Sequence, residues 1–569
     1  MQEMSEGRRA LIAVAISLLI VIVWSHFYKP PAPQQQPKAT APISSTAPQE
    51  EENKAAPLGA PTTPAKTAAP AAAQAAEEKT VTVENSLYRV EFSNRGGVVR
   101  SWELKKYFDD KKNVLDLVNT AAAKQLGEWP FSVLLSDAQM EARANSGLYV
   151  ISPGDADLEA PADLTLHWSD GHLEITKKLE FSDSYEVRAE VTASLDGNAL
   201  PVALAWRGGF GDTTVYQESQ LVSVFYNEGG KLNVLPYKKL GVSGNAEQPM
   251  LRPGGVAYGG IEDQFFTAAF LPNGSSLNVW DWARQQNVSE DGKTSQEPVA
   301  EMAAGSATAG PADMRVFVGP KDLKILGYEK PPLEELVNFG WMSIIAKPLL
   351  WVLQWMYKYV PNYGWDIVLL TLAINTVLFP LKMSSWRSMQ KMQRVGPEIR
   401  QIQDRYKKYS FNDPRKKKMN EEVMGVYNRE GINPMGSCIP MIAQMPIWWA
   451  LYRMLGGAIE LRHAPWFWWV HDLSAHDPYY IIPIAMTITM YLMQKMTPTT
   501  TVDPTQQKMA TYMPLMFGIF FFRLSAGLNL YIFTSNLVGM AQQYYLNRTN
   551  PVPVKGGGGA QKKLKTAKA

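Results

Sequence analysis

The residues that could do chemistry in this chain lie inside apolar segments rather than in a catalytic motif. The stretch 433–452 is apolar enough to enter a bilayer, yet it contains Ser437, Pro440, Gln444 and Pro446. Polar and helix-disrupting residues persist at membrane depth where they face protein or a water-filled cavity, because lipid cannot satisfy their hydrogen bonds. The chemistry predicted here is therefore the sheltering of polar groups inside a membrane.

Conventional catalytic and metal sites are not indicated by the spacing of the reactive residues. Gly292-Lys293-Thr294 is the nearest fragment of a phosphate-binding loop, but Asn287 stands where the first glycine of such a loop belongs. We find no paired carboxylates flanked by aromatic residues, as sugar-hydrolysing sites require. The histidines lack the spacing of a metal-ligand set; those considered are His167, His172, His463, His471 and His476. We therefore expect no enzymatic activity, no metal and no cofactor.

Length and composition indicate several domains, one of them in a membrane. The chain has 569 residues, 46% of them hydrophobic, and the apolar residues cluster in its last third. Cys438 is the only cysteine, which excludes an intrachain disulfide. Residues 1–28 hold an apolar segment that follows two arginines and lacks a small-x-small cleavage site, so we predict an uncleaved signal anchor. Residues 29–79 are rich in Pro and Ala and predict a flexible linker.

Residues 80–325 alternate apolar and polar side chains in short runs. Examples are 88–92, 173–176 and 185–191, and turn sequences such as 195–198 separate the runs. A period of two places one face of each strand in a core and the other face in water. The region therefore predicts an all-β sandwich domain.

The chain beyond residue 332 predicts a helical membrane bundle. Residues 333–347 mix apolar residues with acids, which suggests an amphipathic helix along the membrane surface. The apolar stretches that follow are near the ~20 residues that a bilayer requires, although two of them are short; they are 349–381, 434–457, 479–496, 509–524 and 527–546. With the anchor, these stretches make six predicted spans.

The distribution of positive charge sets the predicted orientation. Residues 382–433 are rich in Lys and Arg, whereas 459–478 carry one firm positive charge. The positive-inside rule then places 382–433, both chain termini and the basic tail 547–569 in the cytoplasm, and the β domain in the periplasm. Residues 382–433 predict a helical hairpin, with a break at Pro397 and a second helix that is capped by Asp413.

Long motifs in 333–546 are similar to those of the YidC/Oxa/Alb insertase family. They include the stretch 433–452 and the strings Glu460-Leu461-Arg462, Asp472-Leu473-Ser474-Ala475, Gln494-Lys495-Met496-Thr497-Pro498 and Ser535-Asn536-Leu537. The anchor and the large β domain resemble the Gram-negative form of YidC. The resemblance implies a five-span insertase core, a periplasmic β-supersandwich domain, and a polar groove in which the hydrophilic end of an entering protein rests.

The resemblance also implies the residues of that groove. Its substrate-contacting positions fall on Thr371, Asn375, Gln444, Met445, Pro446 and Tyr531. The family normally has an arginine where this chain has Asn375. One hypothesis is that Arg523, in the fifth span, supplies the missing positive charge; the alternative is that Arg523 lies at the interface or pairs with Asp366.

The basic hairpin has two interpretations, which can both hold. Its charges set the topology, or they also contact lipid headgroups, the ribosome or a substrate; the candidate contacts are Arg387, Lys391, Arg394, Arg405, Lys416 and Lys417. The partners implied by the resemblance are nascent membrane proteins, the Sec translocon with its accessory subunits, the ribosome and the phospholipid bilayer, with no specific nucleic-acid sequence. A secondary transporter and a membrane-anchored periplasmic sugar-binding protein remain as alternative functions.

Overall fold

A computed structural model describes residues 72–154, 157–214, 222–240, 248–274, 277–290, 293–409, 413–432, 439–497 and 504–549. The predicted anchor 1–28 lies outside the described residues, as do the linker up to residue 71 and the tail beyond 549. The chain divides into two compact units, Met1–Lys66 with Thr501–Ala510 and Thr67–Thr500 with Thr511–Ala569. All elements discussed below belong to the second unit, apart from the first turns of helix α12.

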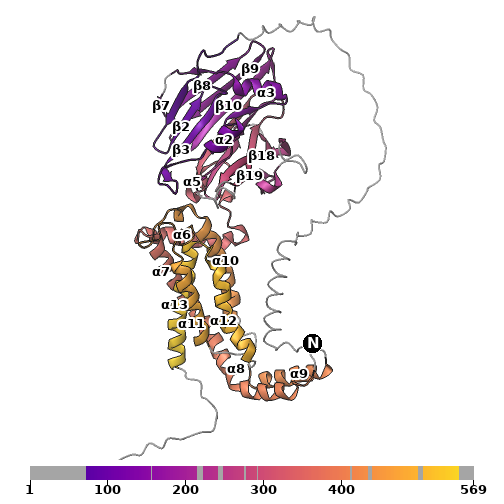
Figure 1. The fold of residues 1–569 in the computed structure, drawn as a ribbon, viewed down its shortest axis with the longest axis vertical. Helices are drawn as coiled ribbons and strands as arrows, with labels where there is room; N and C mark the ends of the chain where they lie inside the picture. Colours follow the sequence, from indigo (N-terminus) through magenta and orange to yellow (C-terminus); the bar gives the residue numbers. More distant parts are fainter. Residues whose placement is uncertain are drawn as a thin grey trace, which may run out of the picture. The chain divides into compact units, whose positions relative to one another are not determined.

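The β domain contains three sheets in its described residues (Figure 1). The large sheet has the order β14 (Lys231–Pro236), β13 (Ser223–Glu228), β16 (Tyr258–Glu262), β17 (Phe266–Pro272), β20 (Ala312–Pro320), β10 (Glu186–Leu195), β9 (Leu173–Phe181), β8 (Ala162–Ser169) and β6 (Val150–Ser152), with β11 (Asn198–Ala199) beside β10. A second sheet has the order β4 (Val114–Asp116), β3 (Val98–Phe108), β2 (Tyr88–Ser93), β1 (Thr80–Glu84) and β7 (Asp157–Glu159). The third has the order β15 (Met250–Val256), β18 (Leu277–Glu290), β19 (Lys293–Gly305), β12 (Ala203–Trp206) and β5 (Ser132–Leu134).

Aromatic side chains from different sheets pack in one core. Tyr88 of β2 lies against Phe181 of β9, with ring centroids 6.5 Å apart. Trp102 of β3 lies against Trp206 of β12, at 6.2 Å. Alternate residues of β9 are buried from Leu173 to Phe181, as the period of two predicts. The fold is therefore the predicted all-β sandwich.

Short helices accompany the sheets and lead to the helical region. They are α2 (Thr120–Leu126), α3 (Ala138–Ser146), η1 (Tyr237–Lys239), α5 (Leu323–Tyr328), η2 (Glu334–Leu336) and η3 (Gly340–Met342). The sequence predicted one amphipathic helix over 333–347. The structure instead has two 3₁₀ turns over 334–342, and residues 343–347 begin the α-helix Ser343–Tyr357. Gly340 adopts a φ of 69°, which interrupts a right-handed helix.

The helical region contains eight longer helices in its described residues (Figure 1). They are α6 (Ser343–Tyr357), α7 (Tyr363–Val377), α8 (Phe379–Arg405), α9 (Pro414–Arg429), α10 (Ile439–Gly457), α11 (Ile481–Met496), α12 (Pro504–Phe521) and α13 (Ala526–Thr549), and the turn η5 (Ile459–Leu461) follows α10. Helix α13 packs against α7 and α11, while α10 packs against α6. The large buried surface of α13 identifies it as the central helix of this packing.

Two sequence predictions about these helices are wrong. The apolar stretch 349–381 is divided into α6, which ends at Tyr357, and α7, which begins at Tyr363. The Asn362 side chain caps α7 by accepting from Trp365 N at 3.2 Å. Helix α8 runs through Pro397 without the predicted break. Asp413 caps α9 as predicted, and it accepts from Arg415 N at 2.9 Å.

No described helix is, by itself, long and apolar enough to cross a membrane. Helices α7 and α8 meet the length and composition criteria as a pair, with a bend of 54° between them. Helix α11 and the stretch Thr511–Phe521 are shorter apolar helices.

Candidate functional site

A cavity of about 700 Å³ lies among α8, α10, α11 and α13. It is lined at the C-terminal parts of α11 and α13 and the N-terminal parts of α8 and α10, so it belongs to one end of the helical packing. The polar residues on its wall include Lys382, Gln444, Gln494, Ser535, Asn536 and Gln542. Apolar residues complete the wall, among them Met389, Met445, Trp448, Trp449, Met493 and Leu546. A cation, amides and hydroxyls thus share one hollow with aromatic and thioether groups.

Lys382 brings the positive charge to this cavity. It lies in the first turn of α8, immediately beyond the 54° bend that follows α7. The Lys382 Nζ donates to Asn375 Oδ1 at 2.6 Å. Asn375 in turn donates through Nδ2 to Thr371 O at 2.8 Å and to Ser535 Oγ at 3.3 Å. The carbonyl of Asn375 accepts from Gln542 Nε2 at 3.3 Å. Asn375 therefore connects α7 with the cation of α8 and with two cavity residues of α13.

Three predicted groove residues lie beneath the cavity wall instead of on it. Thr371 is fully buried, and its Oγ1 donates to Ile367 O at 2.6 Å. Asn375 is 1% exposed, and so is Tyr531. These three side chains therefore do not line this cavity; α13 covers the face of α7 that carries Thr371 and Asn375, and Tyr531 is buried within α13. Asn375 acts on the cavity only through its polar contacts.

The predicted residues of α10 are closer to the cavity. Gln444 and Met445 both line it, and Met445 is 51% exposed. Pro446 is half-buried in α10 and is not part of the wall. Proline has no N–H, so the carbonyl of Ile442 loses its usual helical donor at this point. Of the six predicted groove residues, two contact the cavity directly.

Comparison with known proteins identifies both regions of the chain. Residues 355–553 match the family described as 60Kd inner membrane protein, and residues 80–352 match the YidC periplasmic domain. A protein named membrane protein insertase YidC from Wolinella succinogenes is 32% identical over 561 residues, which cover 95% of each chain. A protein of the same name from Methylobacillus flagellatus is 31% identical and covers 96% of this chain and 97% of its own.

This chain belongs to the YidC family. It is thus an inner membrane protein with a periplasmic β domain. A solved YidC insertase is 18% identical, covering 83% of this chain and 94% of its own with a TM-score of 0.35. A galactose mutarotase related enzyme from Lactobacillus acidophilus is 9% identical and covers 42% of this chain and 97% of its own, with a TM-score of 0.27. Structural similarities this low add nothing about the function of the chain.

The YidC helices present apolar side chains on their outer surfaces. Several of them on α11 and α12 are between 41% and 70% exposed, namely Ile484, Ile488, Leu492, Ile519 and Phe520. Exposed apolar surface of this extent indicates contact with a membrane or a partner. In a YidC protein, this surface is suited to the lipid that surrounds the helices.

Arg523 does not lie at the cavity of this YidC protein. It is exposed, and it lines a separate hollow with Gln264, Arg453 and Ser474. The positive charge of Arg523 therefore lies outside this cavity. The carboxyl oxygens of the buried Asp366 have no hydrogen-bond partner among the described residues, so Asp366 does not pair with Arg523 either.

Sequence reasoning missed Lys382, which brings a positive charge to this cavity. Lys382 was counted among the basic residues that set topology, although it follows Asn375 by two helical turns. The first cation after the α7–α8 bend was the signal that could have identified it. The neighbouring Ser535 and Asn536 belong to a family string, but the string did not say which way they face.

The predicted hairpin contacts lie on α8 and α9. Arg387, Lys391, Arg394, Arg405 and Lys417 are exposed, and Lys416 is half-buried. Arg405 pairs with Glu422 of α9 at 2.8 Å, which joins the two helices on their surface. The buried side chains of α8 include Met392, Val395, Ile399 and Ile402, and those of α9 include Val426. Most of the predicted cations therefore remain accessible.

Proposed function

We propose that this protein is a membrane protein insertase and folding chaperone. Its substrates are nascent inner-membrane proteins, and the cavity receives their hydrophilic ends. The observation that supports this most directly is a half-buried cation among amide and hydroxyl groups, inside helices whose outer surface is apolar. Polar groups in the cavity replace part of the hydration that a segment loses when it leaves water.

Insertion by this route requires no bond-making chemistry, metal or cofactor. A hydrophilic segment rests in the cavity and avoids part of the cost of bare hydrocarbon. The apolar span of the substrate then moves into lipid, with about 25 cal/mol gained for each Å² of apolar surface removed from water. Membrane partition of the substrate thus provides the driving force.

The residues of the cavity have different proposed roles. Gln444 and Met445 contact the substrate, since both lie on the wall. Lys382 pairs with carboxylates of the entering segment, and Asn375 positions the Lys382 ammonium. The remaining three predicted residues support the cavity wall from behind it through packing within their helices; they are Thr371 in α7, Pro446 in α10 and Tyr531 in α13.

The partners and the topology follow the expectations from the family. We propose that the Sec translocon with its accessory subunits, the ribosome and phospholipids are partners, and that the exposed hairpin cations contact headgroups or the ribosome. Both termini are assigned to the cytoplasm. The proposed plan is an anchor at 1–28, a linker at 29–79, a β domain at 80–325, a core at 348–546 that contains the hairpin 382–433, and a basic tail at 547–569.

Site-specific crosslinking tests the proposal. A photocrosslinking amino acid at Gln444 or Met445 should capture a ribosome-bound nascent membrane protein. The matched control is the same amino acid at Trp351, which is 67% exposed on α6 and lies away from the cavity wall. Equal capture from all three positions, or capture from Trp351 alone, would contradict a substrate-binding cavity.

A further inference from the structure

An arginine of the helical region is buried against the β domain. Arg462 lies in the segment 458–478 between α10 and α11, which we call the outer loop. Its side chain is 2% exposed, and that of Asp212 in the β domain is 1% exposed. The Arg462 Nη2 donates to Asp212 Oδ2, and Nη1 donates to Phe108 O at 2.9 Å. Because a guanidinium keeps its charge, it can be buried only where a counter-ion and hydrogen-bond acceptors are in place.

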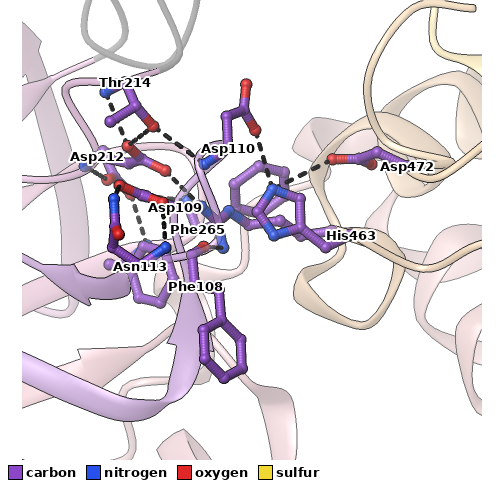
Figure 2. Close-up of polar contacts among 12 residues, drawn as sticks. Phe108, Asp109, Asp110, Asn113, Asp212, Thr214, Phe265, His463 and Asp472 are labelled. Atoms are coloured by element: carbon purple, nitrogen blue, oxygen red, sulfur yellow. Dashed lines mark hydrogen bonds and ion pairs between the residues drawn. The ribbon is translucent and has the colours of Figure 1, made fainter.

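The β domain holds the Asp212 carboxylate in position for this pair. Thr214 donates to Asp212 Oδ1 from its backbone N at 2.8 Å and from its Oγ1 at 2.7 Å, which leaves Oδ2 for the arginine (Figure 2). The backbone N of Asp212 donates to Asp263 Oδ2 at 3.3 Å. Gly211 precedes it with a φ of 94°, and a Cβ there would lie 2.2 Å from Asp263 Oδ2. The receptor for Arg462 is thus built from the β domain's own contacts.

Three further contacts join the same parts of the chain. His463 Nε2 lies 3.0 Å from Asp110 Oδ1 in the turn between β3 and β4, and 3.8 Å from Asp472 Oδ2 within the outer loop (Figure 2). Gln264, which follows β16, donates through Nε2 to Gly456 O at the end of α10. The guanidinium of Arg462 also lies 5.2 Å from the centre of the Phe266 ring. The β domain therefore contacts both the end of α10 and the start of the outer loop.

The outer loop in turn connects the ends of several helices. The carbonyl of Trp466 accepts from Asn362 Nδ2 at the start of α7, at 3.1 Å. The carbonyl of Leu473 accepts from Gly527 N at the start of α13, at 2.8 Å. Asp477 accepts from Ile482 N at the start of α11, at 2.7 Å. These helix ends lie opposite the end where the cavity is lined.

We propose that the β domain is an intramolecular clamp, which holds the outer loop against the ends of α7, α11 and α13 through the Arg462–Asp212 pair. The β domain thereby keeps the helical packing closed at the end remote from the cavity. The clamp is a property of the folded chain, so it does not require the proposed insertase activity. Its test likewise needs no substrate.

Hydrogen exchange of the full-length protein in phospholipid nanodiscs tests the clamp. Asp212→Asn leaves the Arg462 charge buried without its counter-ion, so amide exchange across 458–478 should rise by roughly a hundredfold. The double variant Asp212→Asn with Arg462→Gln removes the unpaired charge and should recover part of that protection. The matched control is Glu84→Gln, which breaks the exposed pair with Lys105 in the same domain and should leave the outer loop unchanged.

Strand β9 reports whether the β domain remains folded in these variants. If Asp212→Asn also raises exchange in β9, the double variant Asp110→Ala with Gln264→Ala removes the peripheral contacts and keeps the buried pair. It should raise exchange in the outer loop by roughly threefold, with β9 unaffected. Unchanged exchange of the outer loop in both variants would overturn the clamp, as would an equal rise with Glu84→Gln. A failure of crosslinking at the cavity would leave the clamp untouched and overturn only the proposed function.

Discussion

Two lysines in different regions show how a structural cation differs from a functional one. Lys177 of β9 is fully buried in the β domain. Its ammonium donates at 2.8 Å to each of three carbonyl oxygens, those of Gly96, Gly97 and Phe131. An ammonium has three donors, so Lys177 has none left for a ligand.

Lys382, in contrast, has fewer of its hydrogen-bond donors satisfied by the protein. It is half-buried at the cavity, and within the described residues its ammonium donates only to Asn375 Oδ1. Two of its three donors are therefore available on the cavity side. The two lysines differ in role because they differ in the number of hydrogen-bond donors that the protein satisfies, and burial alone does not predict this difference. A lysine with all donors satisfied holds a fold together, while one with free donors beside a cavity can bind.

The largest expected effect is on the β domain. Lys177→Met keeps much of the side-chain volume but leaves three buried carbonyls without a donor. We expect the free energy of unfolding of the β domain to fall by roughly 3 kcal/mol or more. Proteolysis of the full-length protein across a urea series measures it. A loss below about 1 kcal/mol would show that Lys177 is not structural, and Lys178→Met, on the exposed face of β9, is the control.

The same lysine should make the stability of the β domain depend on pH. Burial lowers the pKa of Lys177 from 10.5 to about 7. Between those values, the unfolded chain binds a proton that the folded domain releases, so the free energy of unfolding rises with pH. The neutral amine of Lys177 then keeps two of its three N–H donors and no longer buries a charge. From pH 7 to 9, the gain is about 2 kcal/mol, at about 1.4 kcal/mol for each pH unit. The same urea series, repeated at several pH values, should show this slope in the natural chain and a flatter one in Lys177→Met.

At the cavity, a charge substitution should change specificity and leave stability intact. Lys382→Gln should lower the insertion of a substrate with an acidic hydrophilic end by roughly tenfold, which corresponds to about 1.4 kcal/mol. Reconstituted insertion into proteoliposomes measures the yield, and Lys382→Arg should retain it. A substrate with a neutral hydrophilic end is the control. Equal losses for acidic and neutral ends would contradict a charge-pairing role.

Asn375 should act mainly through the lysine that it positions. Asn375→Ala frees the Lys382 ammonium, so insertion of the acidic substrate should fall by roughly threefold. Added to Lys382→Gln, the same change should cause little further loss, because the two residues act as one unit. Fully additive losses in this double-mutant cycle would show that Asn375 contributes independently.

The smallest expected effect on insertion is that of a substitution at Arg523. Arg523→Ala should leave the insertion of acidic and neutral substrates unchanged, since Arg523 lines a hollow separate from the cavity. The insertion assay described above provides the measurement. A selective loss with the acidic substrate would return Arg523 to the groove and contradict the placement of the charge at Lys382.

The sequence predicts the strands of the β domain and the locations of the helices along the chain better than it predicts which side chains line the cavity. Alternation over 173–181 predicts which side chains of β9 face the core, because that pattern is local. The same alternation places Lys177 inside but cannot name its acceptors, since Gly96 and Gly97 lie about 80 residues away. For Thr371 and Asn375, helical spacing predicts a shared face. It cannot predict that α13 covers that face, because this depends on tertiary packing.

The buried pair between Arg462 and Asp212 has a consequence for shortened versions of this chain. A chain that begins after residue 325 retains the arginine but lacks Asp212, Phe108 and Phe266. Its guanidinium would be exposed to solvent next to Leu461, which is itself buried in the intact protein. Any loss of activity in such a truncated chain would then have two causes: the loss of the β domain, and an Arg462 guanidinium without its counter-ion. Replacing Arg462 with a neutral residue in the truncated chain would separate these two causes.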